Sequence, residues 1–308
     1  MSRHVMPWLV AFIAGSTNSK DGFQMMRKNT ALFFGSALLL VILGGCSSLV
    51  NRHLIQPTLD NLQQQTDIDL VCEGAPAYLL MLDSLLVSSP TNRGLLLSAV
   101  QAYTGYSEAF ESCNSDGEER ISAITEKAKR YGKTLLAMQF EFDGSDQKFD
   151  RSLSRTDTAD VPALFWGAMG WLTWVKSQQG SPTALADLVY LEKIMQRLLV
   201  LAPGYQGGSV HLFWGVYYAA KPKMLGGRPE LSRMHFEQAL AASDRRFLMV
   251  QTSYAETYAR STMNRELHDA LLEEVVSFPV DSAAEYGLSN HLAQRRAKKL
   301  LEENYFGD

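Results

Sequence analysis

The sequence has 308 residues, of which 46% are hydrophobic, and 29 lysines and arginines stand against 33 aspartates and glutamates, a formal net charge of -4. This composition is that of a folded globular chain, and its slight acidity offers no basic surface for nucleic acid. Three cysteines are too few for a disulfide-rich scaffold or a four-thiolate metal site.

The amino-terminal part of the sequence predicts export and a lipid anchor. An uncharged run over 31–43 follows two basic residues. It is shorter than the roughly 20 residues that span a bilayer, and it has the length of the apolar core of a signal peptide. The run ends in Leu43-Gly44-Gly45-Cys46, which resembles the bacterial lipobox, where cleavage leaves an acylated cysteine as the first residue. We therefore expect a signal peptide over 25–45 and lipidation of Cys46, by palmitate among other chains; the alternative is a core helix that ends in cysteine by chance.

Three further expectations follow from this anchor: the membrane leaflet, the true start of the chain and the start of the folded domain. In Gram-negative bacteria, Asp directly after the acylated cysteine commonly retains a lipoprotein in the inner membrane. Residue 47 is Ser. The resemblance therefore favours the inner, periplasmic leaflet of the outer membrane. A compact signal peptide would begin at Met25, and we expect residues 1–24 to be an extension from a misassigned start. We expect residues 46–70, which become polar and Gln-rich, to form a lipidated tether before a domain over 71–308.

Beyond the tether, hydrophobic periodicity predicts an all-α domain, with almost no alternating strand pattern. Prolines, glycines and short polar runs separate the periodic segments where helices should end. The predicted helices cover residues 74–89, 91–113, 117–140, 162–179, 183–202, 208–221, 229–243, 246–260, 264–277 and 282–304.

These helices also show a repeat. Tetratricopeptide (TPR) repeats pair two helices and carry small, aromatic, small and proline residues at fixed spacings. The spacing recurs with substitutions in three windows, 78–90, 191–203 and 232–244. Together the windows predict a degenerate TPR-like array of helical hairpins that forms one superhelical domain with a concave surface.

The sequence contains no catalytic, cofactor-binding or metal-binding motif beyond residue 46. We therefore expect neither an enzyme nor a bound cofactor or metal. His211 and His235 lie on separate predicted helices and are interpreted as polar or half-buried residues. An enzyme would need such histidines to converge with Asp or Glu in a cavity.

Cys72 and Cys113 are candidates for a disulfide. The predicted helices 74–89 and 91–113 form an antiparallel hairpin with its turn at Pro90. The start of the first helix therefore lies beside the end of the second, and one cysteine stands at each of these two places. An oxidising compartment favours their pairing. Two inert thiols are the alternative.

Two predicted helices are aromatic and almost uncharged. A helix that is apolar on all sides is normally buried in a large domain, and this is the favoured interpretation. Gly167, Gly170 and Gly215 leave space beside large rings, which would also suit an apolar ligand cavity. The side chains that would line such a cavity are Trp166, Trp171, Trp174 and Trp214.

Several stretches resemble the TatT family, the lipoprotein T-components associated with tripartite ATP-independent periplasmic (TRAP) transporters. The likeness extends over roughly 70–305, and its stretches are 74–80, 90–92, 102–103 with Phe110, 128–132, 162–166, 199–205, 225–230 and 235–240. The stretch 225–230 is the most specific; in it Gly226, Gly227, Arg228 and Glu230 are candidates for a partner surface or, more simply, for a structural turn.

The resemblance implies a TPR-like fold, assembly into a homo-oligomer (a trimer is expected), and a periplasmic partner. That partner is the substrate-binding P-component of a TRAP system. The resemblance also implies a channel in each subunit for an apolar ligand, and it brings no catalytic residues.

The leading hypothesis is therefore a periplasmic adaptor, held to the membrane through its lipid anchor only, that docks a P-component and passes on an apolar or acidic solute. The alternative is a structural or assembly TPR lipoprotein of the cell envelope.

Overall fold

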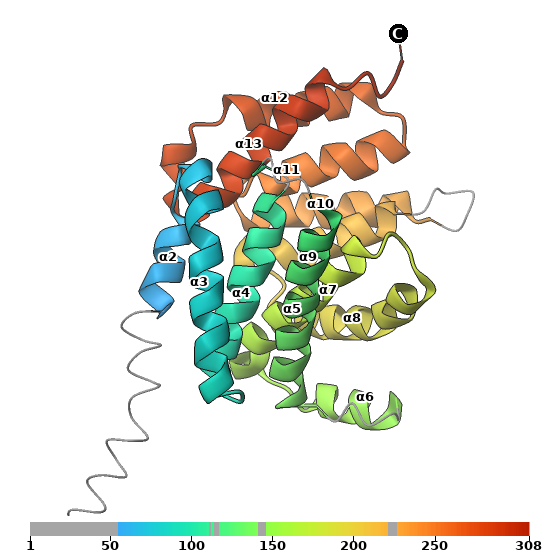
Figure 1. The fold of residues 1–308 in the computed structure, drawn as a ribbon. Coiled ribbons are helices and arrows are strands. Elements are labelled where there is room, and N and C mark those ends of the chain that lie inside the picture. The colour runs from blue at the N-terminus through green and yellow to red at the C-terminus, as the bar shows by residue number, and fades with distance from the viewer. Residues whose placement is uncertain (1–54, 111, 114–116, 141–145, 221–226, 308) are drawn as a thin grey trace, which may run out of the picture. The chain divides into compact units, whose positions relative to one another are not determined.

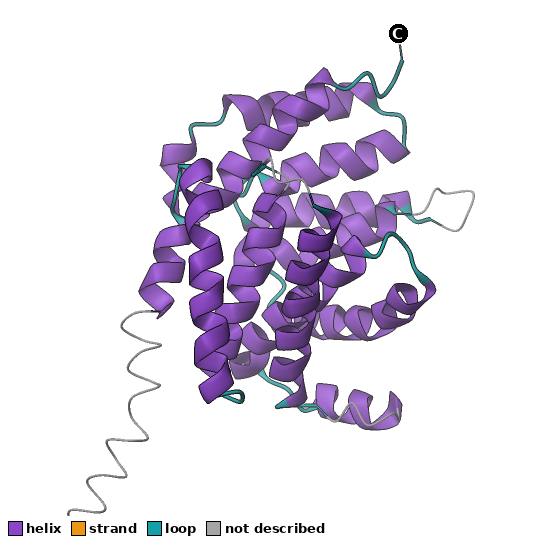
Figure 2. Cartoon of the chain, viewed as in Figure 1, coloured by secondary structure: helices purple, strands orange, loops and turns teal. Residues whose placement is uncertain are grey.

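The computed structural model describes residues 55–110, 112–113, 117–140, 146–220 and 227–307. These residues form helices and connecting turns without a strand (Figures 1 and 2), so the prediction of an all-α fold is confirmed. The expected signal peptide, the lipidation residue Cys46 and Gly226 lie outside the described residues.

Each of the ten predicted helices has a counterpart. The α-helices are α2 (Gln56–Gln63), α3 (Ile68–Ser88), α4 (Arg93–Phe110), α5 (Glu118–Ala137), α6 (Asp146–Ser154), α7 (Val161–Ser177), α8 (Pro182–Leu201), α9 (Tyr205–Ala219), α10 (Pro229–Ala242), α11 (Met249–Ser253), α12 (Arg265–Ser277) and α13 (Gly287–Glu302). A π-helical segment, Tyr254–Ala259, continues α11, and short 3-10 helices precede α7 and α13 at Thr158–Asp160 and Val280–Tyr286.

Side-chain caps fix several helix starts. Asp67 accepts a hydrogen bond from the Leu70 amide at the start of α3, and Asn264 accepts one from the Leu267 amide at the start of α12. Ser181 caps α8 in the same way, and Pro182 occupies the first turn, where a missing N–H costs nothing. Such caps satisfy amides that have no partner within the helix.

The expected tether is partly wrong, because α2 belongs to the domain. Ile55 is fully buried and Leu59 is nearly so. The Tyr78 hydroxyl of α3 donates to the Ile55 carbonyl at 3.0 Å. The sequence predicts a linker here because this short, Gln-rich helix contains one buried residue, Leu59. The helix α6 was also missed, and it too is short and polar, with Phe149 and Leu153 buried.

Consecutive helices pack against one another as an array of hairpins, and they enclose three apolar clusters. The first cluster lies among α2–α5, the second among α5–α9, and the third among α10–α13. The last helix, α13, returns to contact α2 and α3 (Figure 1). A Cβ on Gly287 would lie 2.9 Å from the Gln64 carbonyl oxygen, so glycine is what lets α13 approach the end of α2 so closely.

Glycines also bring α5 and α7 into backbone contact. A Cβ on Gly132 would lie 2.6 Å from the Gly167 carbonyl oxygen, and one on Gly170 would lie 2.6 Å from that of Ala128. At Gly215 the neighbour is the Phe236 ring, 2.9 Å from an added Cβ. The space beside these glycines is therefore filled by neighbouring helices, and the expectation that it leaves room for a ligand is wrong.

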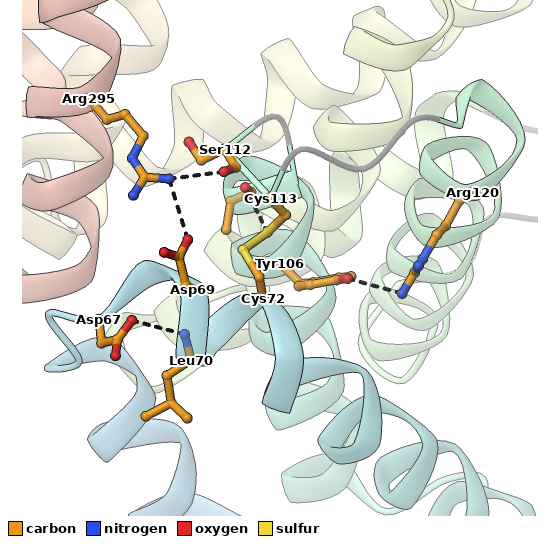
Figure 3. Close-up of a disulfide and its surroundings, with 10 residues drawn as sticks. Asp67, Asp69, Leu70, Cys72, Tyr106, Ser112, Cys113, Arg120 and Arg295 are labelled. Atoms are coloured by element: carbon orange, nitrogen blue, oxygen red, sulfur yellow. Dashed lines mark hydrogen bonds and ion pairs between the residues drawn. A yellow bond between two sulfur atoms is a disulfide. The ribbon is translucent and has the colours of Figure 1, made fainter.

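Cys72 of α3 and Cys113, three residues past α4, form a disulfide, with 5.5 Å between their Cα atoms (Figure 3). Arg295 of α13 reaches the same place: its guanidinium donates to the Ser112 carbonyl at 3.0 Å and lies 3.9 Å from the Asp69 carboxylate. The first hairpin is thus fastened to itself and to the last helix at one end.

One described helix, α3, is long and apolar enough to cross a membrane by length and composition, with a mean hydropathy of 1.6 over its most apolar window. Its inner face packs into the first cluster through Val71, Tyr78, Leu82 and Leu86. That face makes α3 a core helix of the domain. No described residue covers its outer face in this way, and Leu80 and Val87 are exposed there.

Candidate functional site

Two of the four candidate tryptophans are core residues covered by lysines. Trp171 of α7 donates its indole N–H to Asp187 of α8 at 2.8 Å. Lys129 of α5 lies 3.0 Å from the same carboxylate, and its ammonium nitrogen lies 3.0 Å from the centroid of the Trp174 ring. A cation over an indole face is a favourable contact. Trp171 and Trp174 therefore stabilise the packing of α5, α7 and α8 and do not line a groove.

Trp166 and Trp214 have a different environment. Each has an indole N–H that is buried and lacks a hydrogen-bond partner. Trp166 is half-buried and contacts both the first and the second apolar clusters. A buried donor without a partner costs on the order of 1–3 kcal/mol and usually indicates a missing acceptor.

Trp214 of α9 lines a groove with a volume of about 490 Å³ between α6, α8 and α9. Leu153 of α6 and Val200 of α8 supply the other apolar surface. Of the four candidate tryptophans, Trp214 is the one that lies at this groove.

The charged residues of the groove are paired with one another or with the backbone. Lys193 lies 2.8 Å from Asp150, whose carboxylate raises the pKa of the lysine. Arg197 donates to the Thr156 hydroxyl at 3.2 Å, and also to backbone carbonyls of that loop. With Glu192, the lining thus has two acidic and two basic side chains, so a ligand would meet no net charge.

Tyr217 connects the groove to the aromatic surface of α9. Its hydroxyl donates to Glu192 Oε1 at 2.6 Å. Burial, followed by this hydrogen bond, raises the pKa of Tyr217 to about 12. The phenol therefore stays protonated at neutral pH and acts as a hydrogen-bond donor.

Behind the groove, aromatic rings of α9 and α10 stack. Trp214 and Tyr218 have ring centroids 5.5 Å apart, and Tyr218 and His235 have centroids 5.7 Å apart. Offset stacks at such separations are favourable. The stack fixes the orientation of Trp214 at the groove.

His211 and His235 are brought together, which the sequence interpretation did not foresee. Their Nδ1 atoms lie 3.0 Å apart. Burial, and then the neighbouring His211, lowers the pKa of His235 to about 4, and burial also lowers the pKa of His211. At neutral pH one uncharged ring donates and the other accepts. Within the described residues no group of three or more His, Cys, Asp or Glu side chains could hold a metal ion, so we assign this pair a structural role between α9 and α10.

The described part of the Gly226–Glu230 stretch begins α10. The Arg228 carbonyl accepts the Ser232 amide at 3.0 Å, and Pro229 occupies the first turn. Glu230 places an acidic side chain in that turn, where the helix dipole favours negative charge. Arg228 and Glu230 are exposed. These contacts explain the stretch as the start of a helix. Because Arg228 and Glu230 are exposed, a partner could also bind there.

The sequence interpretation missed the groove residues of α8. Glu192, Lys193, Gln196 and Arg197 are spaced i, i+1, i+4 and i+5, which places them on one side of a helix. That polar stripe was the available signal. It is indistinguishable from an ordinary solvated face unless α6 is known to pack beside it.

Comparison with known proteins gives one relative and one matching family. A protein of Treponema pallidum (strain Nichols), named only as an uncharacterized protein, is 26% identical over 257 residues, which cover 77% of this chain and 79% of the relative. The family model for the TRAP transporter T-component, TAtT, matches residues 64–306. That match includes the whole hairpin array from the end of α2 through α13, and so the chain belongs to the family of TRAP transporter T-components.

Proposed function

We propose that this T-component is a lipid-anchored periplasmic adaptor that docks the P-component of a TRAP system and hands on a solute. The family match carries the proposal, because it associates the chain with TRAP transport and with no enzyme family. The lipobox-like Leu43–Cys46 supports the anchor, and Ser47 after it favours the periplasmic side of the outer membrane.

The groove beside Trp214 supports a role in holding the solute. It offers the Trp214 ring, two aliphatic side chains and a balanced set of charges. An organic acid with an apolar body would place its carbon atoms against Leu153 and Val200 and its carboxylate near Lys193 or Arg197. We propose this class of solute, and we propose that the groove is a part of the path along which it moves.

Copurification tests the docking. Tagged, acylated protein isolated from its native host should bring down a periplasmic solute-binding protein of the P type. The paired substitution Arg228→Ala and Glu230→Ala should reduce this recovery if the exposed start of α10 is the partner surface. Met263→Ala, at another exposed position, is the control. Repeated recovery of envelope-assembly proteins in place of a P-component would contradict docking and favour the structural alternative.

Calorimetry with straight-chain carboxylic acids of increasing length tests the solute. Val200→Ala removes two exposed methyl groups from the groove, so it should weaken binding several-fold, since each buried CH2 group contributes about 0.8 kcal/mol. Equal affinity of Val200→Ala and the unchanged protein would exclude this side chain from the site. Light scattering on the same samples measures the molar mass of the assembly. We propose that it is a trimer.

A further inference from the structure

The outer face of α3 is apolar and uncovered among the described residues. Leu80 is 63% exposed and Val87 is 83% exposed, the largest value among the large hydrophobic residues described. Ala77, Ser84 and Ser88 are exposed on the same side of the helix, and they carry no charge. This face follows helical spacing, so the second half of α3 presents an uncharged stripe to its surroundings.

The stripe continues around the end of the first hairpins. Pro90, in the turn between α3 and α4, is exposed, and Met138, at the end of α5, is 45% exposed. The ends of α4 and α5 are held together here, because Arg93 and Gln139 both contact Asp160, at 3.9 Å and 2.7 Å. We call Leu80, Val87, Pro90 and Met138 the tip patch.

Charge is distributed unevenly along α3. The exposed acidic residues Asp60, Asp67, Asp69 and Glu73 gather at the end where α2 passes into α3. Leu80 and Val87 of the tip patch lie in the second half of α3, away from that acidic end. The acidic end also exposes Leu70 and the tip also exposes Arg93, but the exposed acidic side chains gather at one end of α3 only.

The point where the chain enters the domain is fixed beside the middle of α3. The Ile55 carbonyl accepts the hydrogen bond from Tyr78, and Ile55 is fully buried. Cys46 precedes Ile55 by nine residues, and nine residues span at most about 30 Å when extended. If Cys46 bears the acyl chains, α3 is held within that distance of the membrane surface.

We propose that the tip patch rests in the headgroup region of the membrane that holds the anchor. Aliphatic side chains gain free energy when they enter this region, and together with the acyl chains they would orient the domain on the bilayer. The proposal rests on the lipid anchor of the proposed function and adds a second, non-covalent contact.

A bilayer fits the tip patch better than a second copy of the chain does. A stable protein interface buries roughly 800 Å² on each partner. Four partly exposed side chains at the end of a helical hairpin fall well short of that area. A lipid surface adapts to such a convex tip and needs no complementary shape.

Fluorescence quenching in vesicles tests the contact. The acylated full chain is prepared with Val87→Cys or Leu80→Cys, with Met263→Cys, 65% exposed, as the matched control. Cys72 and Cys113 are bridged and Cys46 is acylated, so the new thiol alone takes an environment-sensitive dye. Vesicles of zwitterionic lipid that contain a nitroxide-labelled headgroup provide the quencher.

We expect quenching at positions 80 and 87 to exceed that at position 263 several-fold, with a blue-shifted emission. Equal quenching at 87 and 263 in protein that floats with the vesicles would overturn the membrane contact and leave the anchor intact. Protein that fails to float would remove the anchor itself and the proposal with it. A blue shift at position 87 that grows with protein concentration in detergent, without vesicles, would assign the patch to a second copy and also overturn the proposal.

Discussion

His211 and His235 share one proton between Nδ1 atoms 3.0 Å apart, and this bond joins α9 to α10 directly behind Trp214. Such a pair tolerates no second proton, because a doubly protonated pair has no acceptor. The link is therefore intact only while at least one ring is neutral.

This arrangement makes stability depend on pH. The pKa of His235 is lowered to about 4 and that of His211 is also lowered, so the unfolded chain binds protons on these residues before the folded protein does. The stabilising contribution is full above the ordinary histidine pKa of about 6.5, and it falls as the pH decreases toward 4. Between pH 7 and pH 5, His235 alone should account for a loss of about 2 kcal/mol.

Urea unfolding at these two pH values measures the loss. The double substitution His211→Gln and His235→Gln removes the titration, so the variant should lose about 2 kcal/mol less than the unchanged protein between pH 7 and pH 5. Carboxylates contribute equally to both proteins and cancel. An identical loss in the two proteins would show that the histidine pair does not sense pH.

Close packing of α5 on α7 predicts a severe effect of one methyl group. Gly170→Ala places its Cβ against the Ala128 carbonyl, which belongs to a helix backbone and cannot rotate away. We expect a loss of about 3 kcal/mol in unfolding free energy. Gly105→Ala on α4 meets nothing within 4 Å, and it should stabilise by up to about 1 kcal/mol through helix propensity. Urea midpoints of the two variants give the comparison, and similar midpoints would contradict the packing.

Asp187 should be far more important to stability than an exposed acid. Asp187→Ala removes the carboxylate that pairs with Lys129, whose side chain is 15% exposed, and it removes the acceptor of the Trp171 N–H bond. The expected loss is about 3 kcal/mol. Asp150→Ala is the control, because that side chain is 52% exposed in its pair with Lys193 and its loss should stay below about 1 kcal/mol. Equal losses, measured by thermal unfolding, would show that the buried pair contributes no more than the exposed one.

The bridge between Cys72 and Cys113 closes a loop with a sequence separation of 41. Cross-linking such a loop restricts the unfolded chain, and replacing both cysteines by serine should cost about 4 kcal/mol of unfolding free energy. A thiol titration of the native protein should find neither cysteine reactive. Two reactive thiols in oxidised protein would contradict the bridge.

The sequence predicted most of the helices because their apolar periods and their breaks at Pro90, Pro182 and Pro229 are local signals. It missed α2, whose packing depends on Ile55 and Leu59 meeting residues of α3. Two buried side chains on a polar segment give no periodic signal, so the partner helix decides whether such a segment folds onto the domain.

The candidate site could be read only in part. An uncharged helix predicts that Trp171 and Trp174 are buried. Nothing local shows that Lys133 covers Trp171 and Lys129 covers Trp174, because lysines in the polar run 127–133 look solvent-facing. The His211–His235 contact needs the register of α9 on α10, and the groove needs the position of α6. Both depend on how helices pack against one another, and local sequence patterns do not show this.

The return of α13 to α2 and α3 closes the array end to end. In an open helical solenoid each repeat touches only its neighbours, and the terminal repeats fray independently. Here Gly287 and Arg295 join α13 to the end of α2 and to α3, so neither end of the described array can open without breaking contacts between segments far apart in the sequence. We therefore expect the described domain to unfold as a single cooperative unit, and to fold slowly for an all-helical protein, since α13 must meet α2 and α3 before the structure is complete.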